Sequence, residues 1–183
     1  MDERIDIVDS QGNATGKTCY KSEAHRFGYF HITVHIWLYT LENKILLQKR
    51  ALTKQVFPGL WDISVAGHIG TGEEIKTAAL REIKEEIGLD LQLEDLSKIT
   101  VRKHQVHHDN GIIDNEFHHV FIAELTAPLK NLRIQESEVA ALQLFDLNIL
   151  KHTNKYENIL LPEFHEYYAL VHSKITETLK EKK

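Results

Sequence analysis

The alternation of apolar and polar side chains predicts a β-sheet core in the first third of the chain. A period of two, typical of a strand, places Ile32, Val34, Ile36 and Leu38 opposite Thr33, His35, Trp37 and Tyr39. A turn at 41–43 and an apolar run at 44–49 extend this strand into an antiparallel hairpin near the sheet centre. Shorter strands are predicted at 4–8 and 62–65, turns at 9–13 and around Gly16, and a loop at 50–61 closed by Pro58-Gly59.

The second half of the chain predicts further strands and a C-terminal helix. We expect a connector at 91–96, a strand at 98–103, a polar loop at 104–110, and strands at 112–125 and 141–145. Asp146 is expected to cap a short helix running towards His152. From 162 to 180, helical spacing of apolar residues predicts an amphipathic helix packed on the sheet through Phe164, Tyr168, Val171, Ile175 and Leu179. Because no repeat or linker interrupts the pattern, residues 1–183 are expected to form a single domain.

The segment 67–89 combines a glycine-rich loop with a predicted helix. Three glycines fall within residues 67–72, and the glycine-free run that follows ends at Gly88. Thr71 is expected to be the N-cap, with Glu74 as its capping-box partner, and Gly88 suits the left-handed position after the last turn. Helical spacing places Glu82, Glu85 and Glu86 on one face, beside an apolar face of Leu80, Ile83 and Ile87.

The three clustered carboxylates have two interpretations. They form a solvated acidic face whose charge is offset by Lys76, Arg81 and Lys84, or they bind a divalent cation. Carboxylates this close repel one another unless a counter-charge neutralises them. Mg²⁺ fits the second interpretation, because it prefers oxygen ligands and is often held by few carboxylates together with substrate phosphates.

Composition narrows the class of protein. With 42% hydrophobic and 27% charged residues, the chain is typical of a soluble globular protein. It contains no apolar run of about 18 residues and no apolar segment near its start, so neither a membrane span nor a secretory signal is expected. The single cysteine, Cys19, fits a cytoplasmic protein. A net charge of -5 argues against nucleic acid as the partner but not against a phosphate substrate, because a bound metal reverses the local field.

The spacing of residues 67–89 resembles the Nudix box at each defined position. The matching residues are Gly67, Glu73, Arg81-Glu82, Ile83, Glu85-Glu86, Gly88 and Leu89. The resemblance implies an α/β/α sandwich with a mixed β-sheet and a Mg²⁺-dependent hydrolase of diphosphate linkages, Mn²⁺ being an alternative metal. It further implies that Glu82, Glu85 and Glu86 bind metal, that Glu85 or Glu82 is catalytic, and that Gly67, Glu73, Arg81 and Gly88 are structural. Nudix hydrolases are often homodimers, although no stretch of this sequence marks an interface.

The flanking sequence is similar to isopentenyl-diphosphate isomerase and its Nudix relatives over about residues 6–121. The matching stretches are DIVDSQGNATG, residues 21–31, LLQKRALTKQVFPGLWDISVAGH and GIIDNEFHHVF. The resemblance implies that Lys21, Arg50 and Lys54 hold the diphosphate. It also implies a second divalent metal, held by His25, His31, His68, Asp114 and Glu116. The alternative is that these are ordinary core or loop residues. The pairs His107-His108 and His118-His119 receive no role from the resemblance.

Departures from the isomerase pattern favour hydrolysis. Ala66 stands where the isomerase has its proton-transferring cysteine. His104 stands where the isomerase has an aromatic residue that acts as an acid. Bacterial isomerases carry an arginine where this chain keeps Glu82. The sequence therefore predicts a hydrolase acting on a small-molecule diphosphate, either a nucleoside diphosphate derivative or another organic diphosphate. Two alternatives stay open: a prenyl-diphosphate phosphohydrolase or isomerase-like enzyme, and a non-catalytic ligand-binding module.

Overall fold

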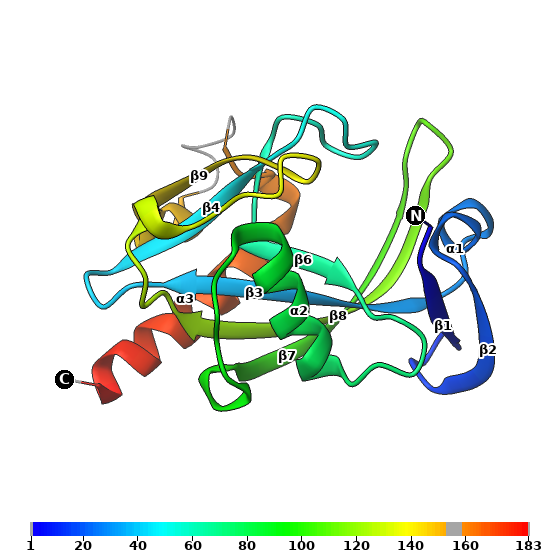
Figure 1. Ribbon diagram of the computed structural model, residues 1–183, viewed down its shortest axis with the longest axis horizontal. Helices are drawn as coiled ribbons and strands as arrows, with labels where there is room; N and C mark the ends of the chain where they lie inside the picture. Colours follow the sequence, from blue (N-terminus) through cyan, green and yellow to red (C-terminus); the bar gives the residue numbers. More distant parts are fainter. Residues whose placement is uncertain (1, 153–158, 183) are drawn as a thin grey trace.

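The computed structural model describes residues 2–152 and 159–182, and within them nine strands form one mixed sheet (Figure 1). The strands are β1 Arg4–Val8, β2 Ala14–Tyr20, β3 His31–Tyr39, β4 Lys44–Arg50, β5 Trp61–Asp62, β6 Val65–His68, β7 Ser97–His107, β8 Ile113–Glu124 and β9 Val139–Asp146. The α-helices are α1 Lys21–Phe27, α2 Ile75–Ile87 and α3 His165–Glu181. Short 3-10 helices are η1 Leu93–Asp95, η2 Leu129–Asn131, η3 Leu147–Lys151 and η5 Pro162–Phe164.

Strand β3 organises the sheet because it pairs with four other strands. It runs parallel to β8 from His31↔Glu116 to Tyr39↔Glu124, and antiparallel to β6 and, at single positions, to β1 and β4. Strands β7 and β8 form a long antiparallel hairpin, and β4 pairs with β5 and β9. Figure 1 shows α2 in front of this sheet and α3 behind it, so the predicted α/β/α sandwich with a mixed sheet is confirmed.

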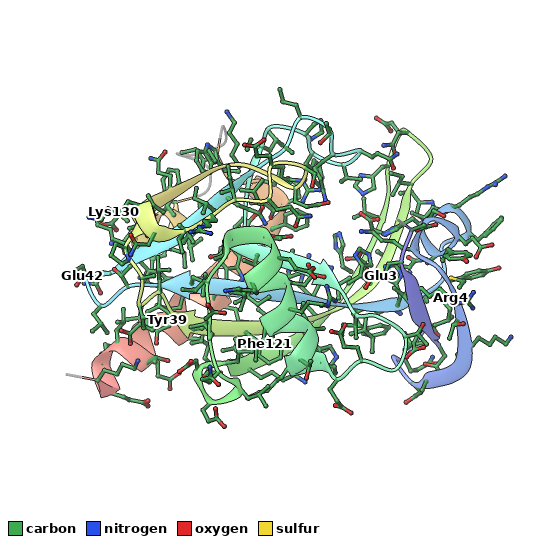
Figure 2. All side chains as sticks on the ribbon, in the orientation of Figure 1. Glu3, Arg4, Tyr39, Glu42, Phe121 and Lys130 are labelled. Atoms are coloured by element: carbon green, nitrogen blue, oxygen red, sulfur yellow. The ribbon has the colours of Figure 1, made fainter. Side chains whose placement is uncertain are left out.

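Both faces of β3 and β8 are buried, which explains their apolar character. On one face α2 packs Ala79, Ile83 and Ile87 against the strands, and Phe121 is buried beneath this helix (Figure 2). On the other face α3 packs Val171 and Ile175 against a cluster that includes Trp37 and Val120. Since neighbouring strand residues point to opposite faces, this two-sided burial accounts for Trp37 and Tyr39 at positions opposite the aliphatic ones.

Most predicted elements are present, with the bounds given above. The strands at 4–8, in the 28–40 region and at 112–125, the Asp146 cap, and the C-terminal helix agree with the sequence analysis. Asp146 accepts a hydrogen bond from the backbone N–H of Asn148 at 3.0 Å, as a helix cap should. No helix in residues 2–152 or 159–182 is long and apolar enough to cross a membrane.

Four local predictions were wrong, each because pairing or docking overrode the local signal. Gly16 lies inside β2, which β1 holds by antiparallel pairing, and is not a turn. Helix α1 was not foreseen, since its seven residues are too few to show a period. Strand β7 continues to His107, because β8 pairs with residues 104–107 that were predicted as a loop. The hairpin of β3 and β4 pairs only at Tyr39↔Ile45 before β4 turns to β9.

The N-terminus of α2 also differs from the prediction. The helix begins at Ile75 with Glu74 as its N-cap residue, and no side chain caps it, so Thr71 is not the cap. Glu73 folds back instead and accepts a hydrogen bond from the Gly70 N–H at 3.0 Å. Gly88 ends the helix at a φ of 70°, in the left-handed region that was predicted.

Candidate active site

The acidic face of α2 lies against β6 at a position that only glycine can occupy. A Cβ atom built on Gly67 would sit 2.0 Å from Cδ of Glu82, so the Glu82 side chain fills the space that any larger residue would need. Strand β6 supplies Gly67 and helix α2 supplies Glu82. The glycine therefore allows a buried carboxylate to cross over the strand backbone and reach the cavity beyond it.

Arg81 holds three carboxylates and the loop in one network. Its Nε and Nη2 donate to the two oxygens of Glu73, both at 2.9 Å, and Nη2 also donates to the His68 carbonyl at 3.0 Å. Nη1 donates to Glu82 at 2.8 Å and to Glu85 at 3.1 Å. These paired hydrogen bonds, which hold the pKa of Glu73 below its usual value, fix the glycine loop onto the helix.

Burial makes the charged state of two helix carboxylates costly. It raises the pKa of Glu82 to about 7, with Arg81 opposing the shift, and raises the pKa of Glu86 to about 8, with the nearby Glu82 adding to it. Glu86 accepts a hydrogen bond from Gln48 Nε2 at 3.0 Å and has no ion pair in the described part of the chain. Glu85 is exposed. A divalent cation between these groups would remove the cost, which is the chemistry predicted for magnesium.

All three carboxylates line a cavity of about 1140 Å³, a volume above the usual range for small-molecule sites. Lys21, Arg50 and Lys54 line it too, as predicted for diphosphate-binding residues. Two of them are already paired with acids: Arg50 Nη1 lies 3.0 Å from Asp62, and Lys54 forms an ion pair with Glu138. An arriving phosphate therefore meets cations whose positions are fixed by carboxylates.

Three of the predicted histidines and one glutamate converge on a point. Ligand atoms of His25, His31, His68 and Glu116 lie within 4.8 Å of one another. Nε2 of His25 lies 3.1 Å from Nε2 of His68, and Nε2 of His31 is 3.4 Å from Glu116. Burial holds the pKa of His68 well below its usual value, so that ring is neutral, as a metal ligand must be. His31 Nε2 is buried without a hydrogen-bond partner, which fits a site that completes its coordination with a cation.

The far sides of these rings are oriented by oxygen atoms. His31 Nδ1 lies 2.9 Å from the Tyr29 carbonyl, and His25 Nδ1 lies 2.9 Å from Asp114 Oδ1. Asp114, predicted as a metal ligand, is outside the converging group, because its other oxygen is held 2.7 Å from His108. Asp114 thus lies in an outer position, from which a carboxylate can orient a histidine ligand, and its own role as a ligand stays a prediction.

The sequence analysis left out several residues of this site. His118 lies 2.8 Å from Glu116 through Nε2 and 3.3 Å from Arg102 through Nδ1, and its ring stacks on that of His35 at 3.8 Å. The signal was available: residues 114, 116 and 118 alternate along β8 and share a face. Arg102 had no signal of its own, since its position opposite His118 depends on the register of β7 and β8.

The group of His35, Glu116 and His118 also has metal-binding spacing, but its chemistry does not suit a metal. Arginine can only donate, so Nδ1 of His118 must accept from Arg102. The proton of a neutral His118 is then on Nε2, where it points at Glu116. Hydrogen bonds to Glu116 from this side hold its pKa well below the usual value, in spite of burial.

No thiol lies in the cavity. Ala66 is on β6 among the residues that line it, and Cys19, the single cysteine of the chain, is on β2 and does not. His104 lines the cavity, and burial lowers its pKa to about 4, so this ring is neutral near pH 7. The ionisable groups that line the cavity are therefore carboxylates, imidazoles, cations and phenols.

Comparison with known proteins gives the same picture. A family model described as NUDIX domain matches residues 29–164. The chain is 33% identical over 168 residues to an uncharacterised Nudix hydrolase of Clostridium acetobutylicum, which covers 89% of this chain and 80% of that protein. It is 32% identical over 151 residues to the isopentenyl-diphosphate Delta-isomerase of Escherichia coli, covering 82% and 80%.

Two further matches differ in their extent. Nudix hydrolase 3 of Arabidopsis thaliana is 36% identical over 146 residues, 78% of this chain, but the chain spans only 19% of the plant protein. A solved structure from Deinococcus radiodurans superposes with a TM-score of 0.68 over 91% of this chain and 98% of its own, at 18% identity. At that identity the match supports the fold alone.

The chain belongs to the Nudix family. With the family model and the curated relatives together, it falls in the class of hydrolases that act on pyrophosphate bonds, as the sequence predicted. The likeness to isopentenyl-diphosphate isomerases is also confirmed.

Proposed function

We propose that the protein is a Mg²⁺-dependent hydrolase of a diphosphate linkage in a nucleoside diphosphate derivative or another organic diphosphate. The observation that carries the proposal is the acidic face of α2, whose Glu82, Glu85 and Glu86 open into the large cavity, where among the described residues one cation, Arg81, forms ion pairs with Glu82 and Glu85. Arg81 alone, shared among Glu73, Glu82 and Glu85, does not offset their charge. A cytoplasmic location and a homodimer stay predictions.

The residues of the helix have distinct tasks in this proposal. Glu82, Glu85 and Glu86 would hold magnesium, which supplies charge neutralisation on the diphosphate and a more acidic water. Glu85 is exposed, and only its Oε2 is engaged by Arg81 among the described residues, so its other oxygen is free to orient and deprotonate the attacking water. Glu82 is the alternative base. Arg81 and Glu73 keep the glycine loop in place around them.

The cations of the cavity orient the substrate. Lys21, Arg50 and Lys54 would neutralise the phosphate oxygens and hold the diphosphate in line with the attacking water. The three-histidine cluster would hold a second divalent ion, Zn²⁺ or Mn²⁺, through neutral imidazoles and Glu116. That ion has a structural role in the proposal, because its ligands join α1, β3, β6 and β8.

Substitution of the helix carboxylates tests the proposal. Glu82→Gln and Glu85→Gln should each reduce Mg²⁺-dependent phosphate release by at least about 100-fold, because each loses a ligand charge or the base. Release is measured over nucleotide sugars, dinucleotides, ADP-ribose and prenyl diphosphates. ADP-ribose is included because the Nudix domain of Shewanella oneidensis NrtR, a structural neighbour with a TM-score of 0.58, was solved with that molecule.

Glu74→Gln is the matched control. Glu74 is exposed at the start of the same helix, makes no side-chain cap, and does not line the cavity, so the variant should keep full activity. Removing metal with a chelator should abolish release, and Mg²⁺ should restore it. Full activity of both Gln variants would rule out the assignment. A protein that binds diphosphates but cleaves none would be the non-catalytic module.

A prenyl diphosphate is the second candidate substrate, supported by the isomerase relatives and by the apolar residues that line the cavity, including Trp61 and Phe164. The isomerase reaction itself is disfavoured by Ala66, which cannot transfer a proton. Phosphate release from isopentenyl diphosphate exceeding that from nucleoside diphosphates would favour this candidate. Allylic isomerisation without phosphate release would instead identify an isomerase.

A further inference from the structure

Arg102 is a cation that the protein leaves without an acid. It lies on β7, half-buried, and lines the cavity. Within residues 2–152 and 159–182 it forms no ion pair, whereas Arg50, Lys54 and Arg81 each contact a carboxylate. Burial lowers the pKa of Arg102, and tyrosines and Glu116 oppose that shift only in part. Leaving a buried cation unpaired is costly, which indicates that a counter-charge arrives with a ligand.

The guanidinium is held in one plane by its neighbours. Its central carbon lies 5.1 Å from the ring centre of Phe164 and 5.0 Å from that of Tyr167, so the group makes two cation–π contacts. One donor, Nη1, is used on His118 at 3.3 Å. In the described part of the chain no other hydrogen bond from this side chain is present, and none of its nitrogens is buried without a partner. Since Arg102 lines the cavity, its remaining donors are available to a ligand bound there.

The histidine side chains around Arg102 add no second positive charge to that of the guanidinium. Burial lowers the pKa of His104 to about 4 and that of His35 well below its usual value, so both are neutral. His118 accepts from Arg102 through Nδ1 and lies 2.8 Å from Glu116 through Nε2. A flat guanidinium with free donors in a partly desolvated, aromatic-walled space is the usual way in which proteins bind a carboxylate or phosphate through paired hydrogen bonds.

We propose that Arg102 binds a second acidic group on the substrate, a carboxylate or a phosphate ester, in the part of the molecule that lies beyond the diphosphate. The cavity of about 1140 Å³ contains both the α2 carboxylates and Arg102, so one extended molecule can reach both. The inference rests on the proposed function, since it names the class of diphosphate that the same cavity takes.

Matched pairs of diphosphates test the assignment. UDP-glucuronate and UDP-glucose differ by a carboxylate, and NADP⁺ and NAD⁺ differ by a phosphate ester. Dissociation constants for all four are measured by calorimetry on the intact protein without added metal, and phosphate release is measured separately with Mg²⁺. We expect the acidic member of at least one pair to bind about tenfold tighter or more, and the pair that discriminates identifies the acidic group.

Variants of β7 show whether Arg102 causes the preference. Arg102→Gln should bind both members of the pair equally, and Arg102→Lys should keep part of the preference, because it retains the charge without the paired donors. Lys103→Gln is the control. Lys103 is the next residue on the strand, is exposed, and does not line the cavity, so that variant should keep the full preference.

Equal binding within both pairs by the wild type, binding of none of the four, or a preference that survives in Arg102→Gln would each overturn the proposal. Failure of the proposed hydrolysis gives a different result. In that case the acidic member still binds more tightly and Arg102→Gln still abolishes the difference, but Mg²⁺ produces no phosphate release.

Discussion

At the scale of single residues, the site depends on a missing side chain. Gly67 has a backbone that any residue can adopt, since it is absent from the positive-φ positions, so its identity is set by space and not by conformation. Its Cβ position is filled by Glu82. Gly67 is thus required because its missing side chain leaves room for the Glu82 carboxylate, and not because the backbone bends there.

Gly67→Ala should therefore reduce activity more than stability. The added methyl group must displace Glu82, so we expect Mg²⁺-dependent phosphate release to fall by at least about 100-fold while the protein stays folded. Gly70→Ala is the control, because the nearest atoms to a Cβ there, carboxylate oxygens of Glu3 and Glu73, are 3.4 Å away, an ordinary contact distance. Activity and thermal unfolding are compared for the two. Equal activity of both variants would contradict this account of Gly67.

His119 predicts how stability varies with pH. Burial, aided by Lys98, lowers its pKa to about 4, and its Nδ1 is buried without a partner. The unfolded chain binds a proton there at a pKa of about 6.5, so the neutral ring contributes stability that is complete above pH 6.5 and is lost as pH falls towards 4. As pH falls from 7.5 to 5, the unfolding free energy of His119→Gln should rise by about 1 kcal/mol relative to that of the wild type. This figure is reduced because the His119 ring is partly exposed.

Urea unfolding at both pH values measures the difference. Taking the difference between variant and wild type cancels the other titrating groups, which are common to both proteins. Parallel pH curves would show that His119 carries no buried, neutral ring in the folded state.

At the scale of elements, Arg81 joins α2 to the loop that precedes it. The helix has no side-chain N-cap, so the bidentate contact with Glu73 and the hydrogen bond to the His68 carbonyl take over the task of fixing its start. The loop 67–74 and the helix are thus expected to lose order together.

Arg81→Lys should lower the free energy of unfolding by about 2 kcal/mol, because a single ammonium cannot reproduce the paired hydrogen bonds. Lys84→Met, which removes an exposed pair with Asp90, should change it by less than about 0.5 kcal/mol. Urea unfolding gives both values, and hydrogen exchange should show faster exchange across 67–74 in the arginine variant only. Unchanged exchange there would mean that the loop is held by other contacts.

The elements also show what could be predicted from the sequence. Strand β3 was foreseen from its alternation, strand β8 from its β-branched and aromatic residues, and helix α3 from the period that one-sided burial gives. Helix α1 was missed, since docking of the buried Ala24 and the left-handed Gly28 decide it, not seven residues of pattern. The end of β7 was predicted as a loop because its polar side chains face no core: His104 lines the cavity, and Gln105 and His107 are exposed.

In the candidate site, too, some residues could be predicted from local sequence and others could not. The carboxylates of α2 follow from spacing within one helix, and the histidine cluster was expected only from the family resemblance. The contacts of Arg102 with His118, and of Asp114 with His25 and His108, depend on strand register and on the position of α1. No local pattern encodes such register, which is why Arg102 was overlooked and the contacts of Asp114 with His25 and His108 were not foreseen.

At the scale of the whole molecule, the histidine cluster joins parts far apart in the chain. His25 comes from α1, His31 from β3, His68 from β6 and Glu116 from β8. An ion held there would bind the folded state alone, so it should raise the melting temperature in proportion to its differential binding.

Mn²⁺ or Zn²⁺ at about 100 times its dissociation constant should raise the melting temperature by about 5 °C or more for a chain of this size. His25→Gln should lose most of that rise, and His107→Gln, at an exposed position of β7 outside the cluster, should keep it. Differential scanning calorimetry with and without the ion measures both. A rise that persists in His25→Gln would place the ion elsewhere.

The parallel pairing of β3 with β8 has a consequence for the order of assembly. It sets His31 beside Glu116, 85 positions later, so the cluster is incomplete until residues beyond 113 have been added to the sheet. Contacts of such long range form late, and an ion that needs them cannot guide the early chain. The ion should therefore slow unfolding and not speed folding. Saturating manganese would prolong the lifetime of the folded protein and leave its refolding rate almost unchanged.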